Sequence, residues 1–239
     1  MPRRLLLLAT LAAAVTLVAC RGEEDRDPRA IEAVIDWVDF LKLDGIHYEP
    51  QALRGLGRTT ISEEQHCALH GVVEQHLADN ITDPMYRSVD GDASFLPKGT
   101  KIYEIDGYAA WFRVAAETEG ELLLYEVADN PNATHGRDIL DIEGKVTRIS
   151  VNTEPSTLDE RRALEDQAVV ETLVGLMLDA PVVEVETRSP GAAYPLVFHL
   201  TDGTTVRRVF WPSTGILGRG LQLPPEFGDL LEASLRPVP

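Results

Sequence analysis

Hydrophobic and polar residues alternate in short runs along the first half of the chain, and turn-forming pairs separate the runs. Residues 36–49 contain Asp44-Gly45 between alternating apolar positions, a pattern that predicts a strand, a tight turn and a second strand. Further strands are predicted at residues 72–77, 101–105, 110–115 and 121–127. Residues 50–71 show no clear period, and only a short helix over residues 62–69 is expected there. Short strands with regularly spaced turns favour a small barrel or sandwich.

The second half of the chain mixes strand and helix patterns. A helix is predicted after Asp166, a candidate N-cap, because apolar residues recur on one face; an earlier start at Thr157, with Glu160 in capping-box spacing, is the alternative. Another helix should run from Pro224-Pro225 to Leu235. Strands are predicted at residues 145–152, 161–164, 182–187 and 196–211, the last with a hairpin turn at residues 202–203. This order favours an α+β domain with helices on one face of an antiparallel sheet.

Residues that break regular structure cluster in segment 129–136, Asp-Asn-Pro-Asn-Ala-Thr-His-Gly, which is interpreted as a linker. The expected organisation is therefore α+β overall, with a β-rich barrel or sandwich domain over residues 35–128 and a small α+β domain over residues 137–239.

The N-terminal segment has the features of an export signal. Arg3 and Arg4 precede an apolar run over residues 5–18, which is short for a permanent membrane span. The following Leu17-Val18-Ala19-Cys20 resembles the lipobox of bacterial lipoproteins, and the resemblance implies that Cys20 carries a diacylglycerol anchor. The alternative is an ordinary signal peptide cleaved near Ala19. We expect a signal peptide over residues 1–19, a lipidated Cys20 with a charged tether over residues 20–34, and an extracytoplasmic protein held at a bacterial membrane.

Composition narrows the range of partners. The 239 residues include 22 Lys+Arg and 39 Asp+Glu, for a formal net charge of −17. Removal of Arg3 and Arg4 with the signal peptide changes the count to 20 minus 39, or −19. Such a charge argues against a nucleic-acid partner, because phosphate binding depends on cationic side chains. After lipidation of Cys20 only Cys67 remains of the 2 cysteines, so no intramolecular disulfide is expected.

One segment carries several soft metal ligands. They are His66, Cys67, His70 and His76, a set that suits zinc or copper. If residues 62–69 continued as a helix, His66 and His70 would lie one turn apart on the same face. The other interpretation is a histidine-rich surface segment in which Cys67 is a small buried side chain.

Two further groups of residues have alternative interpretations. Asp90-Gly91-Asp92 could bind calcium or could form a turn in which the aspartates accept backbone hydrogen bonds. Trp37, Trp111 and Trp211 could line a carbohydrate or peptide groove, or could belong to the core.

Two other segments carry a family resemblance. They are Trp37-Val-Asp-Phe-Leu-Lys-Leu-Asp-Gly-Ile-His-Tyr48 and Gly91-Asp-Ala-Ser-Phe-Leu-Pro-Lys-Gly-Thr-Lys-Ile-Tyr103. Both resemble a group of uncharacterised lipoproteins and secreted proteins of Bacillus-like bacteria, over roughly residues 35–128. The resemblance implies an extracytoplasmic location and a β-rich domain, and it implies no activity.

Catalytic signatures are absent from the sequence: it has no Gly-x-Ser-x-Gly elbow, no phosphate-binding loop and no Ser-x-x-Lys. The preferred interpretation is a non-catalytic binding or accessory module of the cell envelope, without a cofactor, whose partner is a protein or an envelope ligand. The alternatives are an envelope hydrolase with a site assembled from scattered residues, and a metal-binding lipoprotein that uses residues 66–76.

Overall fold

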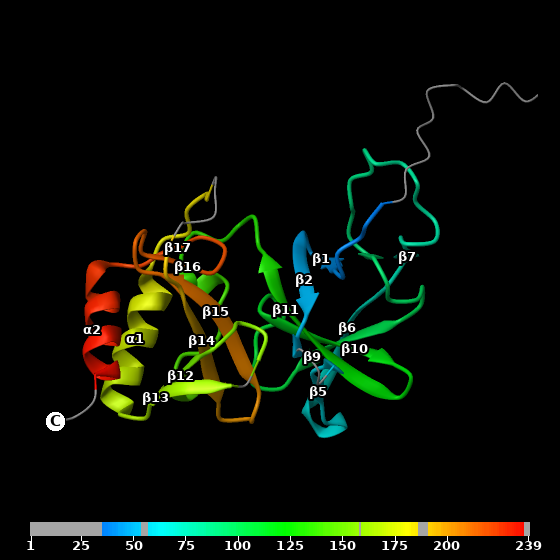
Figure 1. Cartoon of the computed structure of the whole chain (residues 1–239). Helices are drawn as coiled ribbons and strands as arrows, with labels where there is room; N and C mark the ends of the chain where they lie inside the picture. Colours follow the sequence, from blue (N-terminus) through cyan, green and yellow to red (C-terminus); the bar gives the residue numbers. More distant parts are fainter. Residues whose placement is uncertain (1–34, 54–56, 158, 186–190, 237–239) are drawn as a thin grey trace, which may run out of the picture.

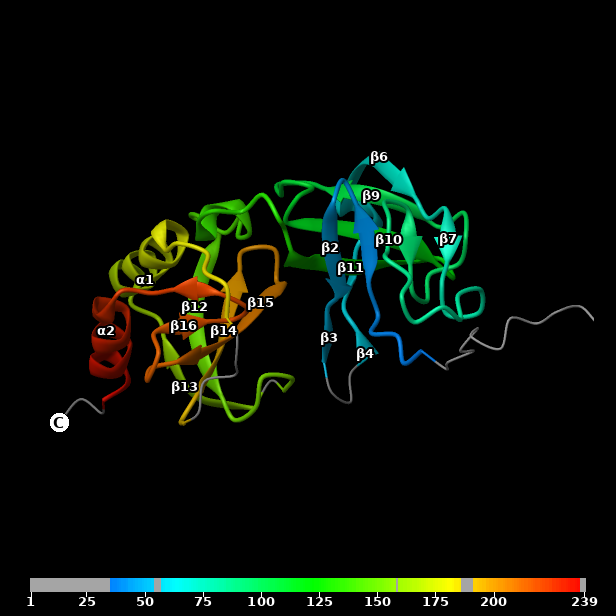
Figure 2. The same cartoon turned by 90° about the horizontal axis from the view of Figure 1, so that it is seen from above.

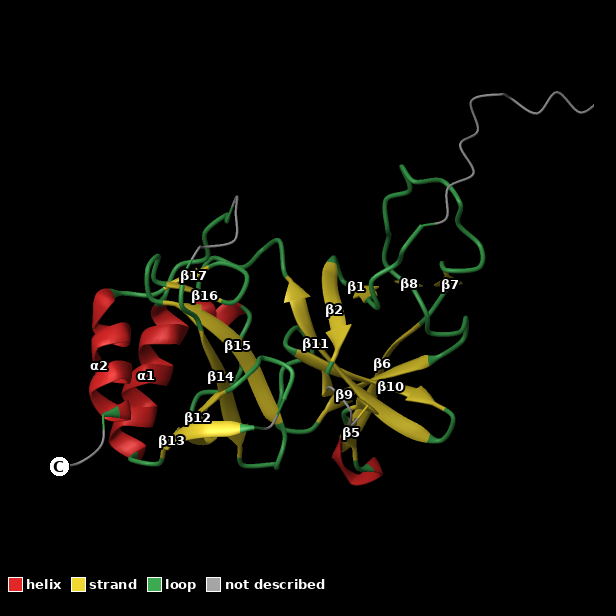
Figure 3. Ribbon diagram, viewed as in Figure 1, coloured by secondary structure: helices red, strands yellow, loops and turns green. Residues whose placement is uncertain are grey.

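The structure is a computed structural model that describes residues 35–53, 57–157, 159–185 and 191–236. The predicted signal peptide, Cys20 and the tether lie outside these ranges. The fold is α+β, as predicted, with two antiparallel-rich sheets formed by successive parts of the chain and with two α-helices at one end of the molecule (Figures 1 and 3).

The first sheet has nine strands and curls on itself. Its strands are β1 (Leu41–Leu43), β2 (Ile46–Pro50), β5 (Thr60–Ile61), β6 (His66–Val72), β7 (Gln75–His76), β8 (Asp92–Ala93), β9 (Lys101–Ile105), β10 (Arg113–Thr118) and β11 (Glu121–Asp129). They are ordered β6-β9-β10-β11-β2-β1-β8-β7, and β5 pairs with β11. The curl brings β6 next to β1, since a Cβ on Gly71 would lie 3.3 Å from the δ-carbons of Leu43. This near-closed sheet agrees with the predicted small barrel or sandwich.

The predicted hairpin over residues 36–49 is confirmed by β1 and β2. Asp44 and Gly45 both have positive φ, 53° and 76°, as a type I′ turn requires. A second, small hairpin joins β3 (Ala52–Leu53) to β4 (Gly57–Arg58).

The helix predicted over residues 62–69 is wrong. Only Glu63–Gln65 forms a 3-10 turn, and the chain then enters β6, which pairs with β9. Pairing with a neighbouring strand outweighs the weak local preference, since strand formation depends on tertiary context. The strand predicted over 72–77 is also reduced to β7, because β6 already ends at Val72.

The second sheet has six strands in the order β13-β12-β14-β15-β16-β17. They are β12 (Val146–Asn152), β13 (Glu160–Leu164), β14 (Tyr194–Leu200), β15 (Thr205–Trp211), β16 (Ile216–Leu217) and β17 (Leu221–Gln222). The hairpin predicted at residues 202–203 joins β14 to β15. The strand predicted over 182–187 is wrong in its described part, where Val182 makes a single bridge to Leu221; its last two residues lie outside the described ranges.

Helices α1 (Gln167–Asp179) and α2 (Pro225–Leu235) cover the face of this sheet that is turned away from the first sheet (Figures 1 and 2). The predicted start of α1 is confirmed, because the Asp166 carboxylate accepts hydrogen bonds from the backbone of the first turn. Phe227 of α2 packs edge-on against Phe210 of β15, with ring centroids 5.0 Å apart. Neither helix has the length and apolar character needed to cross a bilayer, and the described ranges contain no other helix that does.

The two sheets share a hydrophobic core. One cluster of buried side chains includes Leu41 and Tyr48 from the first sheet together with Leu173 and Phe198 from the second half. Between the sheets, residues 130–135 lead into a 3-10 turn at Gly136–Asp138. Gly136 lies against the end of α1, where a Cβ would come 1.9 Å from the carbonyl oxygen of Met177. The connecting segment is therefore packed against the second half of the chain.

Candidate functional site

The predicted metal ligands lie on strands and not on a helix. His66 and Cys67 belong to β6, but their side chains fall outside the described part of the structure. His70 lies between two carboxylates, with Nε2 3.1 Å from Asp44 and Nδ1 3.7 Å from Glu104. His70 therefore joins β6 to the β1–β2 turn and to β9.

His76 has different neighbours. Its Nδ1 lies 3.1 Å from the carbonyl oxygen of Leu96, and its Nε2 lies 3.3 Å from Asp79. Among the residues that the structure describes, no group of three histidine, cysteine, aspartate or glutamate side chains is placed to hold a metal ion.

The aspartates of the Asp90-Gly91-Asp92 segment organise the loop around it. Asp90 accepts a hydrogen bond from the Gly45 amide at 2.8 Å. The buried Asp92 accepts bonds from the Val89 amide and the Tyr86 hydroxyl, both at 2.8 Å. These contacts are those that the turn interpretation predicts.

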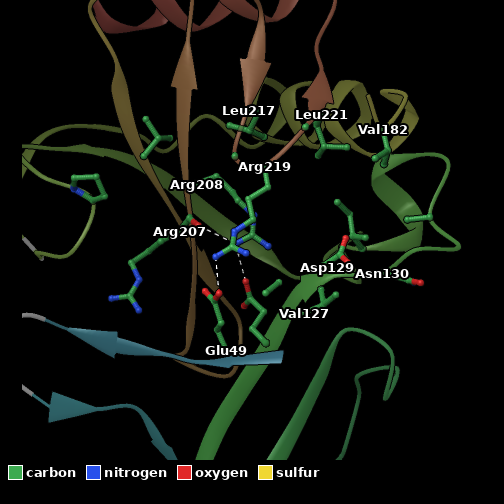
Figure 4. A pocket seen from close by; sticks show the side chains of 18 of the residues that line it. Glu49, Val127, Asp129, Asn130, Val182, Arg207, Arg208, Leu217, Arg219 and Leu221 are labelled. Atoms are coloured by element: carbon green, nitrogen blue, oxygen red, sulfur yellow. Dashed lines mark hydrogen bonds and ion pairs between the residues drawn. The ribbon is translucent and has the colours of Figure 1, made fainter. Parts of the chain in front are cut away.

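A cleft of about 410 Å³ lies between the two sheets (Figure 4). Its walls come from β2, the end of β11, the segment after β11, β15 and the turn between β16 and β17. Apolar side chains form much of the wall, among them Val127, Val182, Trp211 and Leu217. The volume falls within the range of about 300–1,000 Å³ that is typical of small-ligand sites.

The base of the cleft is a buried charge network centred on Glu126 of β11. Oε2 of Glu126 accepts bonds from Nε and Nη2 of Arg113, at 3.0 and 2.7 Å, and from the Gln51 amide at 2.7 Å. Oε1 accepts a bond from Arg208 of β15 at 2.7 Å. Because Arg113 also donates to the carbonyl oxygen of Thr205 at 2.6 Å, the network joins the two sheets.

Burial and charge act in opposite directions on Glu126. Removal from water would raise the pKa of its carboxyl, but Arg208 and Arg113 outweigh this effect and hold the pKa below its ordinary value. Arg113 is 0% exposed, and its guanidinium lies 4.7 Å from the ring centroid of Phe112 and 5.2 Å from that of Tyr108. Glu126 therefore remains ionised in a closed set of partners.

A Gly218-Arg219-Gly220 turn between β16 and β17 forms the opposite side of the cleft. Gly220 has a φ of 151°, and a Cβ there would lie 2.4 Å from the carbonyl oxygen of Val183. The turn holds the exposed Arg219 over the cleft, where it donates a 2.5 Å hydrogen bond to Glu49 of β2 (Figure 4). This ion pair is largely open to solvent, so it is weak compared with the pair at Glu126.

Arg207 lies at one end of the cleft. Figure 4 shows its side chain on the other side of β15 from Arg208. Its Nη2 is 3.3 Å from Oε1 of Gln51, whereas its Nη1 is buried without a hydrogen-bond partner. Burial is the main cause that lowers the pKa of Arg207, although a guanidinium stays charged at neutral pH.

Asp129 lies at the opposite end of the cleft (Figure 4). The ladder between β11 and β2 shifts register between Val127 and Asp129, and such bulges redirect the side chains that follow them. The exposed Asp129 lies opposite His47 of β2 in the ladder, and its negative charge opposes the burial that lowers the pKa of His47.

Of the three tryptophans, only Trp211 lines this cleft. Trp111 packs against the hydrophobic core, and Trp37, which precedes β1, packs at a tilt against Phe40. The hypothesis that the tryptophans line a ligand groove therefore applies to Trp211 alone. The cleft was not predicted from the sequence, although a glutamate at position 126 inside a strand of apolar residues is a signal of a buried charge.

The chain was also compared with known proteins. Protein-family models, curated proteins and solved structures gave no match to this chain.

Proposed function

We propose that the chain is a lipid-anchored, non-catalytic ligand-binding module of the bacterial cell envelope, and that its ligand occupies the cleft between the two sheets. The observation that carries the proposal is the cleft itself: about 410 Å³ of space with apolar walls and a few fixed charged groups. This combination is typical of small-molecule sites, in which apolar contacts supply affinity and polar groups supply orientation.

The chemistry of the cleft favours binding over proton transfer. Both glutamates that line it are bound to arginines: Glu126 to Arg113 and Arg208, and Glu49 to Arg219. A general acid at neutral pH needs a raised pKa, and the pKa of Glu126 is lowered. The rigid base of the cleft serves a binding site, since a preformed site loses little entropy when its ligand binds.

Calorimetric titration of the full chain in detergent with trialanine, di-N-acetylchitobiose and succinate tests the cleft. At least one of these probes should bind saturably. An Ala133→Trp variant should abolish that binding, because Ala133 lines the cleft and a tryptophan would fill part of it. Ala233→Trp, on the exposed surface of α2, is the matched control and should bind like the parent chain. Binding that persists in Ala133→Trp, or no binding of any probe, would overturn the assignment.

Mass spectrometry of the membrane-extracted chain tests the anchor. A diacylglycerol mass on Cys20 is the expected result, since two acyl chains give stable attachment at about 0.8 kcal/mol per buried methylene. A Cys20→Ala variant should leave the membrane fraction. An unmodified Cys20, or a Cys20→Ala variant that still partitions with membranes, would contradict lipidation.

A further inference from the structure

Exposed apolar side chains gather at the end of the first sheet that is farthest from the helices. They come from the segment that precedes β1 and from the segment around β8 (Figures 1 and 3). Four such side chains are Val38 (69% exposed), Met85 (77%), Val89 (57%) and Phe95 (43%). Single exposed apolar residues are common on soluble proteins, but several on adjoining segments mark a surface that meets a partner. We call these four side chains the apolar end surface.

Hydrogen bonds hold the two segments side by side. The Lys42 ammonium group donates to the carbonyl oxygen of Ser88 at 2.9 Å, and the Phe40 amide donates to the Ser94 hydroxyl at 2.8 Å. Within the segment around β8, the buried Asp92 accepts two further bonds from the same loop. The exposed apolar side chains therefore lie on a frame that is fixed by its own hydrogen bonds.

This end of the molecule is also where the described chain begins. The chain enters at Ile35, beside the loop between β7 and β8, and both helices lie at the opposite end (Figure 1). Residues 21–34 separate this point from Cys20, and a segment of that length reaches at most about 50 Å when fully extended. A lipid anchor on Cys20 therefore keeps the apolar end surface close to a bilayer.

The charges around the apolar end surface are mainly acidic. In the adjoining segments 36–40 and 79–98 the exposed charged residues are four aspartates and two basic residues: Asp36, Asp79, Asp83 and Asp90, with Arg87 and Lys98. A second copy of the chain would bring these aspartates together, which is unfavourable. Anionic headgroups would repel them as well, whereas zwitterionic headgroups carry no net charge. The surface is therefore suited to zwitterionic lipid.

We propose that the apolar end surface docks on the bilayer that holds the lipid anchor, and that it prefers zwitterionic headgroups. This inference rests on the anchor in the proposed function and adds a second contact with the membrane. The four apolar side chains enter the headgroup region, where contact with lipid removes them from water. Because the anchor already holds the lipid close, a contact that is weak by itself is sufficient. Docking fixes the orientation of the chain, with the helices turned away from the bilayer.

Photolabelling from the lipid tests this contact. The full lipidated chain is inserted into phosphatidylcholine vesicles that contain a diazirine on a fraction of their acyl chains, and labelled tryptic peptides are measured by mass spectrometry. Peptide 88–98, which carries Val89 and Phe95, should be labelled, whereas peptide 220–239, which carries α2, should not. Addition of phosphatidylglycerol to the vesicles should reduce the label on peptide 88–98.

Met85→Asp and Ala233→Asp are matched variants, since each adds one aspartate at an exposed position. Met85→Asp should weaken docking about tenfold and reduce the label on peptide 88–98, because one large apolar side chain no longer leaves the water. Ala233→Asp, on α2, should be labelled like the parent chain. Both variants should stay in the membrane fraction, because Cys20 is intact, and the urea midpoint of each variant shows that it is folded.

Equal labelling of the two peptides in the parent chain, or the same loss of label in both variants, would overturn docking. Stronger labelling in vesicles that contain phosphatidylglycerol would overturn the headgroup preference. An unlabelled peptide 88–98, together with concentration-dependent dimers of the parent chain that Met85→Asp removes, would assign the surface to a second copy and overturn docking. If Cys20 carries diacylglycerol and docking fails, the anchor stands; an unmodified Cys20 would remove the anchor and docking together.

Discussion

Replacement of Arg113 by methionine tests the buried network at the base of the cleft. Methionine keeps an unbranched side chain of comparable reach but removes the charge and four hydrogen bonds: two to Glu126, one to the Thr204 hydroxyl and one to the Thr205 carbonyl oxygen. Removal of one member of a buried ion pair costs about 3–5 kcal/mol, because the other charge stays buried. Arg208 and Gln51 still bond Glu126, so we expect the lower end, about 3 kcal/mol.

Urea unfolding at neutral pH measures this loss. With a denaturant dependence of about 1–3 kcal/mol per molar, a loss of about 3 kcal/mol lowers the midpoint by about 1 M or more. Arg137→Met is the control, since the Arg137–Asp179 pair is 56% and 71% exposed and should contribute less than about 1 kcal/mol. The double variant Arg113→Met/Glu126→Gln should lose less free energy of unfolding than the two single variants lose together, because it leaves no unpaired buried charge.

The pH dependence of the free energy of unfolding gives a second measure of the stabilisation by the same network. The pKa of Glu126 is lower in the folded chain than its ordinary value of 4.5, so the stabilisation is fully present above that value and is lost as pH falls through the folded pKa. The difference between the parent chain and Arg113→Met should be largest at neutral pH and should narrow below 4.5. A loss under about 1 kcal/mol at neutral pH, or a gap that does not change with pH, would refute the network as a stabilising link.

Three further measurements follow from the structure. Gly220→Ala should lower the free energy of unfolding by about 1–3 kcal/mol, because its Cβ meets the Val183 carbonyl oxygen, and by more than Gly203→Ala, which has positive φ but open space; equal losses would contradict the close approach. Burial raises the pKa of Tyr108 to about 12, so Tyr108 should not ionise below about pH 11. The rise in phenolate absorbance up to that pH should therefore be the same in Tyr108→Phe as in the parent chain, and a smaller rise in the variant would contradict the raised pKa. Asp166→Ala should cost about 1 kcal/mol in urea unfolding through the lost cap of α1, and an unchanged midpoint would show that the cap contributes nothing.

The sequence correctly predicted those elements that depend on interactions between residues close together in the chain. Asp44-Gly45 specifies its hairpin because both positions adopt positive φ, and Asp166 starts α1 because its own carboxylate bonds the first turn. The prediction failed over residues 62–69, where β6 depends on β9, a strand more than thirty residues later. No local pattern records that pairing.

The cleft likewise depends on contacts between distant segments, which local signals do not predict. The sequence alone shows arginines at 113, 207, 208 and 219 and a glutamate at 126, but these positions are separated by up to about a hundred residues. Their pairing depends on how the two sheets pack, since Glu126 meets Arg113 across one sheet and Arg208 across the junction. The sequence thus determined the acidic charge, most strands and both helices, because these depend on composition and local periodicity. Only the tertiary structure decided which of these charges pair with one another, because that depends on distances between segments far apart in the chain.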